Sequence, residues 1–193
     1  MQQAAGWGWL NEPEKWSLQD GELRVATDHE TDFWQSTWYG FQRHSGHVYG
    51  VETRGDFTFQ LRVEGDFTTL YDQAGLMLLV DQQCWLKAGI EYNDDAPMIG
   101  SVLTNPLSDW STGIFPARQN HFWLRLTHDK GALRLQYSTD GQRWPLLRLC
   151  PFPEAERYFV GAMCCSPGRA GLNVAFSDIT LGEPLQKALH DLS

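Results

Sequence analysis

The fold is decided by three alternating runs joined by two short turns: Phe122-Trp-Leu-Arg-Leu-Thr-His128, Asp129-Lys-Gly131, Ala132-Leu-Arg-Leu-Gln-Tyr-Ser138, Asp140-Gly141 and Gln142-Arg-Trp-Pro-Leu-Leu-Arg-Leu149. In the first run Leu124 and Leu126 alternate with Arg125 and Thr127. A period of two is typical of strands with one buried face, and Asp-Gly-type turns join antiparallel neighbours. This stretch therefore predicts three consecutive antiparallel strands.

The same period of two continues in both directions, from Ser17 to about Thr180, and helical periodicity is nearly absent. So many strands in one domain require two packed sheets. The run 74–80 is apolar at every position, which predicts a central strand covered on both faces. Further strands are predicted over 22–26, 48–52, 57–64, 85–92, 99–104, 158–165 and 172–181.

Residues 184–192 carry the helical signal of the chain: Pro184 near the start and an apolar stripe of Leu185, Leu189 and Leu192. We predict a single domain over residues 1–193. Its fold class is all-β, a two-sheet antiparallel β-sandwich with a short C-terminal helix.

The charge balance excludes several classes of partner. There are 15 Lys and Arg against 24 Asp and Glu, a net charge of −9. That sign argues against nucleic acid and anionic membrane surfaces as partners. No apolar run approaches the ~20 residues that span a bilayer, and the first ten residues lack the basic and apolar regions of a signal peptide. We expect a cytoplasmic protein.

The cysteines and histidines predict no metal and no cofactor. Cys84, Cys150, Cys164 and Cys165 form no Cys-x-x-Cys pair, so we interpret them as reduced, mostly buried thiols. The vicinal pair would point to opposite faces of a strand. The segment 44–47 has two histidines but no third ligand nearby. No Gly-x-Ser-x-Gly, P-loop or dinucleotide fingerprint is present.

Several motifs together resemble one family. They are Thr31-Asp-Phe-Trp-Gln-Ser-Thr-Trp-Tyr-Gly-Phe41, Ser45-Gly-His47, Gly55-Asp-Phe-Thr58, Tyr71-Asp-Gln-Ala-Gly-Leu-Met77, Asp81 with Trp85-Leu-Lys-Ala-Gly-Ile-Glu-Tyr92, Ser101-Val-Leu-Thr-Asn105, Ser108-Asp-Trp-Ser111 and Tyr137-Ser-Thr-Asp-Gly141. In this order they resemble the family catalogued as domain of unknown function 1349, also called regulation-of-enolase-like. The resemblance implies a concanavalin A-like lectin/glucanase sandwich, similar also to the accessory sandwich of some xylosidases.

The implied fold prompts a search for glucanase carboxylates. Glucanases of this fold commonly carry Glu-x-Asp-x-Glu or Glu-x-Asp-x-x-Glu on one strand, and hydrolysis needs two carboxyl groups flanking the bond. The two Glu-x-Asp pairs, at 30–32 and 64–66, both lack the third carboxylate. We therefore expect a protein that is not an enzyme of this type and assign no catalytic residue.

The strand 85–92 carries the most informative pattern. Trp85, Lys87, Gly89 and Glu91 share one face, and the opposite face is apolar. Gly89 leaves an open position where a flat ligand could lie between charged ends, with a tryptophan as a stacking wall. The alternative is a solvent-exposed Lys–Glu pair without a ligand, which contributes under about 1 kcal/mol.

Neighbouring strands would add polar and aromatic groups to the same concave groove. Asp72 could instead cap a turn, and one set of the aromatic residues at 33–41 should pack in the core. Because exposed polar positions contribute little stability, Lys87→Ala and Glu91→Ala should fold and lose ligand. The candidate ligand-binding residues are Trp34, Tyr39, His44, Asp72, Gln73, Trp85, Lys87, Glu91, Ser101, Asp109 and Trp110, with Asp109 and Trp110 expected in a loop.

The leading functional hypothesis is non-catalytic binding of a carbohydrate or glycan-like small molecule in this groove. One alternative is an intracellular interaction or regulatory protein that binds another protein through exposed aromatic residues, as the family label implies. A third is an atypical glycoside hydrolase that draws its carboxylates from Asp72, Glu91 and Asp109.

Overall fold

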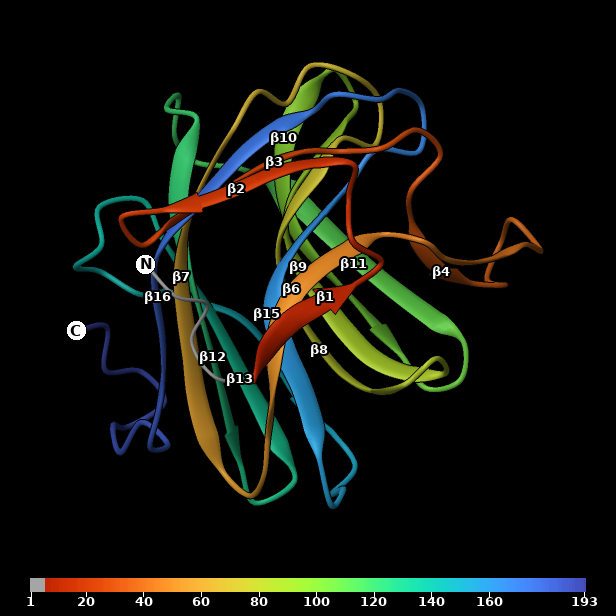
Figure 1. The fold of residues 1–193 in the computed structure, drawn as a ribbon. Helices are drawn as coiled ribbons and strands as arrows, with labels where there is room; N and C mark the ends of the chain where they lie inside the picture. Colours follow the sequence, from red (N-terminus) through yellow and green to blue (C-terminus); the bar gives the residue numbers. More distant parts are fainter. Residues whose placement is uncertain (1–5) are drawn as a thin grey trace.

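Two antiparallel seven-stranded sheets lie face to face in the computed structural model, which describes residues 6–193 (Figure 1). In spatial order the first sheet contains β1 (Trp7–Leu10), β6 (His47–Thr53), β15 (Tyr158–Cys165), β8 (Gln73–Asp81), β9 (Cys84–Asn93), β10 (Ala96–Thr104) and β11 (Ser108–Ile114). The second sheet contains β14 (Leu146–Pro151), β13 (Ala132–Ser138), β12 (His121–Asp129), β7 (Phe57–Gly65), β16 (Asn173–Gly182), β3 (Glu22–Ala26) and β2 (Lys15–Gln19). A separate hairpin pairs β4 (Phe33–Gln35) with β5 (Gln42–His44).

The predicted two-sheet sandwich is confirmed. The strand predicted at 74–80 is β8, the fourth of seven strands in the first sheet. The three runs that decide the fold are β12, β13 and β14, in which Leu126 lies opposite Leu135. Between residues 6 and 193 no helix is long and apolar enough to cross a membrane.

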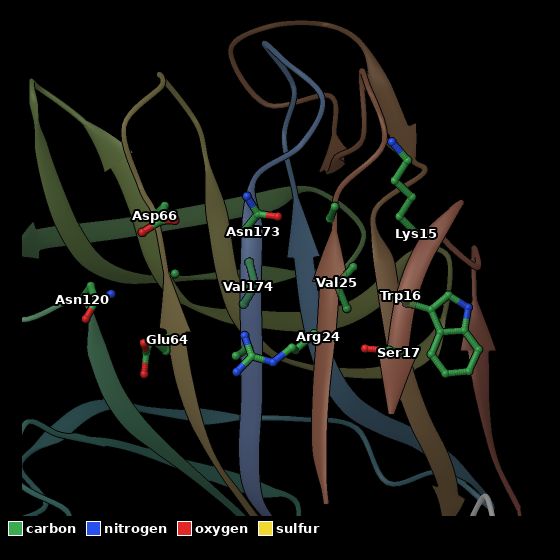
Figure 2. Close-up of a pocket in the computed structure, with 13 residues that line it drawn as sticks. Lys15, Trp16, Ser17, Arg24, Val25, Glu64, Asp66, Asn120, Asn173 and Val174 are labelled. Carbon is green, nitrogen blue, oxygen red and sulfur yellow. The ribbon is translucent and has the colours of Figure 1, made fainter. Parts of the chain in front are cut away.

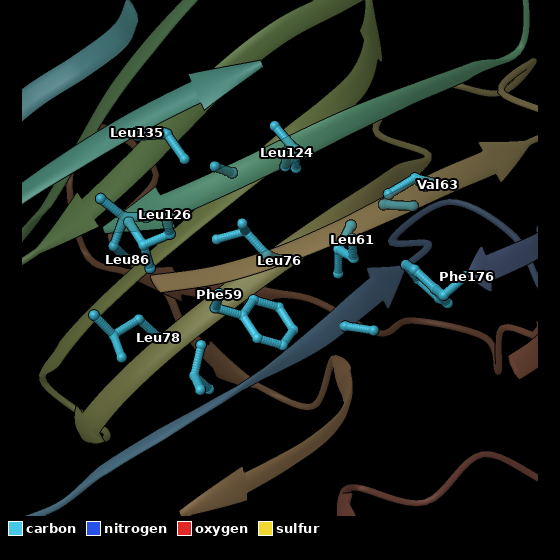
Figure 3. Close-up of a cluster of buried hydrophobic side chains, with 14 of the residues drawn as sticks. Phe59, Leu61, Val63, Leu76, Leu78, Leu86, Leu124, Leu126, Leu135 and Phe176 are labelled. Carbon is cyan, nitrogen blue, oxygen red and sulfur yellow. The ribbon is translucent and has the colours of Figure 1, made fainter. Parts of the chain in front are cut away.

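The main hydrophobic core fills the space between the two sheets. Phe59, Leu61 and Val63 of β7 alternate with more exposed residues and face Leu76 and Leu78 of β8 (Figure 3). Every one of these five side chains is fully buried. Alternation along β7 therefore places each second residue in the core, as the sequence predicts.

A second hydrophobic cluster covers the other face of the first sheet. Phe33 and Trp34 of the β4–β5 hairpin pack there against Met77, Trp85 and Val102. The first sheet is consequently buried on both faces at its centre, and this explains why β8 is apolar at every position.

The vicinal cysteines join the two clusters. Cys164 belongs to the main core and Cys165 to the second cluster, so the prediction that they face opposite ways is confirmed. Both are free and buried, as are Cys84 and Cys150.

The predicted C-terminal helix is wrong. Residues 184–192 form an irregular segment, whose carbonyl groups at Lys187, Ala188, Leu189 and Asp191 accept hydrogen bonds from the Arg134 guanidinium. A helix of this length is marginal in isolation, and in the observed conformation Arg134 supplies hydrogen-bond donors to these carbonyls. The loop expected around Asp109 and Trp110 is also wrong, because these residues lie in edge strand β11.

A row of glycines crosses the centre of the first sheet. Gly75 lies opposite Gly89, and Gly89 lies opposite Gly100, each on the face away from the main core. A Cβ atom on Gly75 would clash with the backbone carbonyl of Ala88. The row lets β8, β9 and β10 approach closely and leaves a flat strip of backbone on the outer face.

We predict that Gly75→Ala lowers the free energy of unfolding by about 3 kcal/mol, because the two strands must separate to admit the methyl group. Gly113→Ala on β11 is the matched control, since nothing lies within 4 Å of its added Cβ. Urea denaturation should show a near-unchanged midpoint for the control. Equal stability of both variants would mean that the close strand approach is not constraining.

Candidate functional site

A cavity of about 300 Å³ lies between the β4–β5 hairpin and the outer face of β8 and β9. Its floor comes from the sheet and its walls from the hairpin, from β11 and from the loop after β15. The lining residues are Glu30, Asp32, Trp34, Tyr39, Phe41, Arg43, Tyr71, Gln73, Lys87, Glu91, Trp110 and Pro167.

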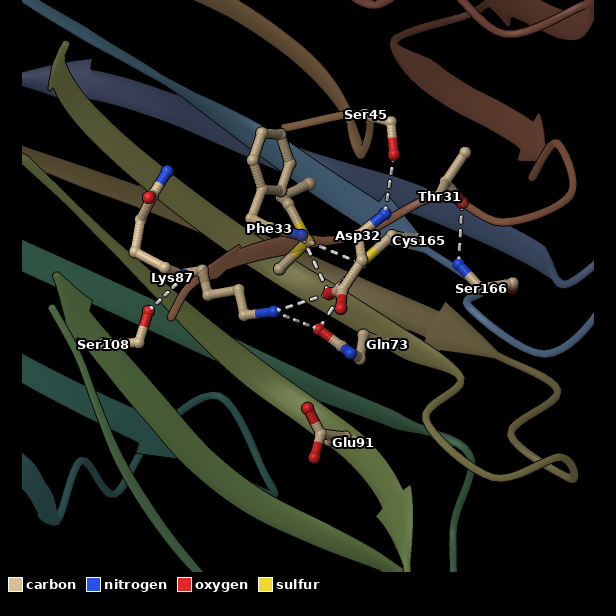
Figure 4. Close-up of polar contacts among 12 residues, drawn as sticks. Thr31, Asp32, Phe33, Ser45, Gln73, Lys87, Glu91, Ser108, Cys165 and Ser166 are labelled. Carbon is tan, nitrogen blue, oxygen red and sulfur yellow. Dashed lines mark hydrogen bonds and ion pairs between the residues drawn. The ribbon is translucent and has the colours of Figure 1, made fainter. Parts of the chain in front are cut away.

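Lys87 occupies the floor and is only 4% exposed. Its Nζ donates to Asp32 Oδ1 at 3.1 Å and to Gln73 Oε1 at 2.7 Å (Figure 4). The thiol of Cys165 donates to the same Gln73 oxygen at 3.4 Å. Through these bonds Asp32, which precedes β4, is connected to Lys87 of β9, Gln73 of β8 and Cys165 of β15.

The ammonium of Lys87 remains charged despite its burial. Burial by itself lowers the pKa of Lys87 and is the largest single effect, but the surrounding acidic groups, Asp32 foremost, together outweigh it and the pKa is raised. An ammonium has three N–H donors, and Asp32 and Gln73 take two of them. The third remains for a group in the cavity.

Glu91 lies two residues beyond Gly89 on the same face as Lys87 and is partly buried. Its Oε1 accepts a hydrogen bond from Asn93 Nδ2 at 3.3 Å. Burial raises the pKa of Glu91 to about 7; the positive charge of Lys87 opposes that shift and the negative charge of Asp32 adds to it. The carboxyl group therefore changes charge close to neutral pH.

Three aromatic rings form the walls. The rings of Trp34 and Trp110 are perpendicular, with centroids 6.4 Å apart. Tyr39 meets Trp34 at 71° and 5.6 Å, and its other side stacks on Phe41. The Tyr39 hydroxyl lies 3.1 Å from that of Tyr71, which closes the rim. The cavity thus combines apolar walls with a charged floor, the mixture found in small-molecule sites.

Six of the residues predicted from sequence line this cavity together: Trp34, Tyr39, Gln73, Lys87, Glu91 and Trp110. The alternative of a solvent-exposed Lys87–Glu91 pair is wrong, because Lys87 is buried and pairs with Asp32. The prediction that Lys87→Ala leaves stability unchanged rested on an exposed side chain, and that premise is wrong.

Asp72 lies outside the cavity lining. It is fully buried, and its carboxylate accepts hydrogen bonds from Arg169 Nε and Nη2 and from the backbone amides of Thr68 and Thr69. The Arg169 guanidinium and the two amides hold the pKa of Asp72 below its usual range against the effect of burial, which alone would raise it. The carboxylate is thus saturated and structural, and it anchors the loop after β15.

Trp85 and His44 are also structural. Trp85 is fully buried beneath Phe33, with ring centroids 6.1 Å apart, so it cannot stack on a ligand. The ring of His44 packs edge-on against Phe33 at 5.1 Å, outside the cavity lining. Both side chains support the hairpin that forms the wall.

Ser101 and Asp109 point to the opposite side of the first sheet. Both contact Arg148 of β14, Ser101 Oγ at 3.4 Å and Asp109 Oδ2 at 2.6 Å. Alternation along β10 places Ser101 on the same side as Ile99 of the main core. The carboxylates suggested for an atypical hydrolase therefore do not converge, since of Asp72, Glu91 and Asp109 only Glu91 lines the cavity.

The sequence-based prediction missed several lining residues, of which Asp32 is the most important. In the sequence Asp32 stands out as the second carboxylate of the Glu-x-Asp pair at 30–32; in the structure its Oδ1 also accepts a hydrogen bond from the Phe33 amide at 2.8 Å. Its partner Lys87 is 55 residues away in the chain. No local pattern shows such a pairing; the other missed residues are Glu30, Phe41, Arg43, Tyr71 and Pro167.

A second hollow, of about 380 Å³, lies over β2, β3, β16 and β7 (Figure 2). Its charged side chains are spread along separate strands, and Arg24 pairs with Glu22 at 2.5 Å. In the part of the chain that the structure describes, Trp16 is the one aromatic residue that lines this hollow. Within residues 6–193 no group of three metal-ligating side chains is present. The cavity beside the hairpin is the candidate site because it combines aromatic walls with buried charged groups.

We predict that Lys87→Met lowers the free energy of unfolding by about 3 kcal/mol, because it leaves the Asp32 carboxylate partly buried without its cation. The double variant Asp32→Asn/Lys87→Met should recover roughly half of that loss. Thermal and urea unfolding of the three proteins tests the pair. No recovery in the double variant would show that packing of the lysine chain, rather than charge, is responsible.

We predict that Glu91→Gln stabilises the protein at high pH. Folding raises the pKa of Glu91 from 4.5 to about 7, so the wild type loses stability as pH rises between these values and the difference is constant above them. Urea titrations should find the variants equal near pH 4 and Glu91→Gln ahead by on the order of 2 kcal/mol at pH 8. Glu154→Gln, at an exposed position, is the control and should show no such trend. If the stability difference between Glu91→Gln and the wild type did not change with pH, the raised pKa of Glu91 would be contradicted.

Comparison with known proteins identifies relatives of the whole sandwich. The sequence profile of the family described as "Protein of unknown function (DUF1349)" matches residues 9–184. "Regulation of enolase protein 1" from Saccharomyces cerevisiae is 53% identical over 185 residues, which are 96% of this chain and 93% of the relative. A crystal structure of "a functionally unknown protein from Saccharomyces cerevisiae" is 50% identical, with a TM-score of 0.91, over 93% of this chain and 97% of that one.

A more distant structure shares the fold. The carbohydrate-binding module CBM66 from Bacillus subtilis superposes with a TM-score of 0.55 at 12% identity, over 92% of this chain and 96% of that one. The lectin-like sandwich implied by the sequence motifs is thus confirmed as a fold.

Proposed function

Because the chain belongs to the DUF1349 family, whose description assigns no activity, we propose a function from its own cavity: non-catalytic binding of a carbohydrate or a similar polyhydroxylated small molecule. The observation that carries the proposal is the meeting of aromatic walls with a buried, charged floor. A sugar ring offers apolar C–H faces to aromatic rings and hydroxyl groups to polar side chains.

The floor supplies hydrogen-bonding groups of both kinds. Lys87 retains one N–H donor after its bonds to Asp32 and Gln73. Glu91 offers carboxyl oxygens, one of which accepts only the 3.3 Å bond from Asn93. A ligand with several hydroxyl groups can donate to one and accept from the other.

The carboxylates of the cavity support binding rather than hydrolysis. Asp32 is neutralised by Lys87 at 3.1 Å and also accepts the Phe33 amide. The positions that follow the Glu30-x-Asp32 pair, where glucanases commonly place a third carboxylate, hold Trp34 and Gln35. The similarity of the sandwich to a carbohydrate-binding module adds to this proposal.

A second candidate function is protein binding in the regulation of an enolase, taken from the printed name of the yeast relative. Trp38, at the tip of the β4–β5 hairpin, is 93% exposed and does not line the cavity. Exposed tryptophans are frequent anchors of protein interfaces. The tip of the hairpin is therefore the surface that this candidate would use.

We predict that Trp110→Ala and Tyr39→Ala reduce sugar affinity at least about tenfold, because each removes a stacking wall. Trp38→Ala is the matched control and should bind sugars as the wild type does. A panel of sugars at millimolar concentration, read by intrinsic tryptophan fluorescence and confirmed by calorimetry, measures the affinities. Circular dichroism confirms that the variants fold.

The same variants separate the two candidate functions. Binding to purified enolase that is lost in Trp38→Ala and kept in Trp110→Ala, together with silence across the sugar panel, would replace carbohydrate binding by protein binding. Sugar binding that survives both wall substitutions would place the ligand elsewhere and contradict the proposed site.

A further inference from the structure

We infer that the cavity prefers a ligand that carries a positively charged amine, so that among sugars it selects an amino sugar with its ammonium group beside Glu91. The inference rests on the proposed function, since it names the class of carbohydrate that the same cavity takes. Three features support it: the pairing of the lining charges, the geometry of the rings and the position of Glu91.

The lining charges leave negative groups unpaired. Three carboxylates, Glu30, Asp32 and Glu91, line the cavity together with two cations, Arg43 and Lys87. Lys87 is taken by Asp32. Within the part of the chain from Gly6 to Ser193, no Lys, Arg or His nitrogen lies within 4.0 Å of the carboxylates of Glu30 or Glu91 in an ion pair.

Arg43 does not form an ion pair with either of these two carboxylates. Its guanidinium lies 5.0 Å from the centroid of the Phe41 ring and donates to the carbonyl of Gln42 at 3.2 Å. The side chain is thus held on the rim of the cavity by the hairpin itself. An incoming cation would meet a Glu91 carboxylate that accepts the Asn93 hydrogen bond but has no ion-pair partner among the described residues.

The rings form a corner rather than a single flat platform. Trp34 stands perpendicular to Trp110, and Tyr39 meets Trp34 at 71°. A flat ring can stack on only one of these walls, whereas a compact ammonium group is attracted to several ring faces at once. The walls therefore favour a ligand in which an ammonium group projects from the sugar ring.

A bound ammonium group stabilises the ionised form of Glu91, and the excess of carboxylates in the cavity lining disfavours an anionic ligand. An ammonium group offsets the cost of holding an ionised carboxylate partly buried. A phosphate or carboxylate ligand would be attracted by Lys87 and Arg43 but repelled by the three carboxylates, which outnumber these cations. Because a bound cation lowers the pKa of Glu91 from about 7, binding of the amine should release a proton near neutral pH. The net charge of −9 also attracts cations to the protein.

Calorimetry with D-glucosamine, D-glucose, N-acetyl-D-glucosamine and choline tests the inference at about pH 6.5, where the sugar amine is protonated. We expect glucosamine to bind at least about tenfold more tightly than glucose or its N-acetylated form, whose nitrogen is uncharged. Titrations in buffers of different ionisation enthalpy should detect proton release with glucosamine and none with glucose.

Glu91→Gln should abolish both the preference for glucosamine over glucose and the proton release, because the amide side chain carries no charge and does not titrate. Glu154→Gln, exposed and outside the cavity lining, is the matched control and should behave as the wild type. Equal affinity of the wild type for glucose and glucosamine, or a preference that persists in Glu91→Gln, would overturn the inference and leave the proposed function intact. Choline binding without any sugar binding would overturn the proposed function instead.

Discussion

The ion pair between Lys87 and Asp32 determines how the outer face of the first sheet is covered. Asp32 immediately precedes β4, so the pair fixes the start of the hairpin that places Phe33 and Trp34 over the sheet. A partly buried pair of this kind is costly to break from one side. The second hydrophobic cluster and the cavity both depend on this position of the hairpin, since one lies under it and the other beside it.

A second ion pair supports the opposite end of the cavity. Asp72 directly precedes β8 and binds Arg169, whose loop also contains the cavity-lining Pro167. Ser166 extends this connection through its backbone amide, which donates to the Thr31 hydroxyl at 2.8 Å. Asp72 thus positions the loop that forms one wall of the site, although the buried Asp72 carboxylate cannot itself contact a ligand.

The sequence was informative where side-chain alternation governs the structure. The faces of β9, the central position of β8 and the opposed cysteines all follow from a period of two, because neighbouring strands maintain it. It failed where partners distant in the chain compete for a group. Arg134 donates hydrogen bonds to backbone carbonyls of the C-terminal segment, and Arg148 donates to both Ser101 and Asp109. Lys87 forms an ion pair with Asp32 instead of remaining exposed. The pattern of polar residues along one strand does not reveal such pairings. For this reason only six of the eleven predicted residues line the cavity, and the other five do not.

The cavity joins segments that are far apart in the chain. The Cys165 thiol and the Asp32 carboxylate, which meet at 4.0 Å beneath the floor, are separated by 133 positions. Segments so far apart in the chain meet only when both sheets and the hairpin are in place. The binding site therefore exists only in the completed fold. A ligand that occupies it discriminates between native and unfolded chains, and its concentration sets how much of the protein is folded.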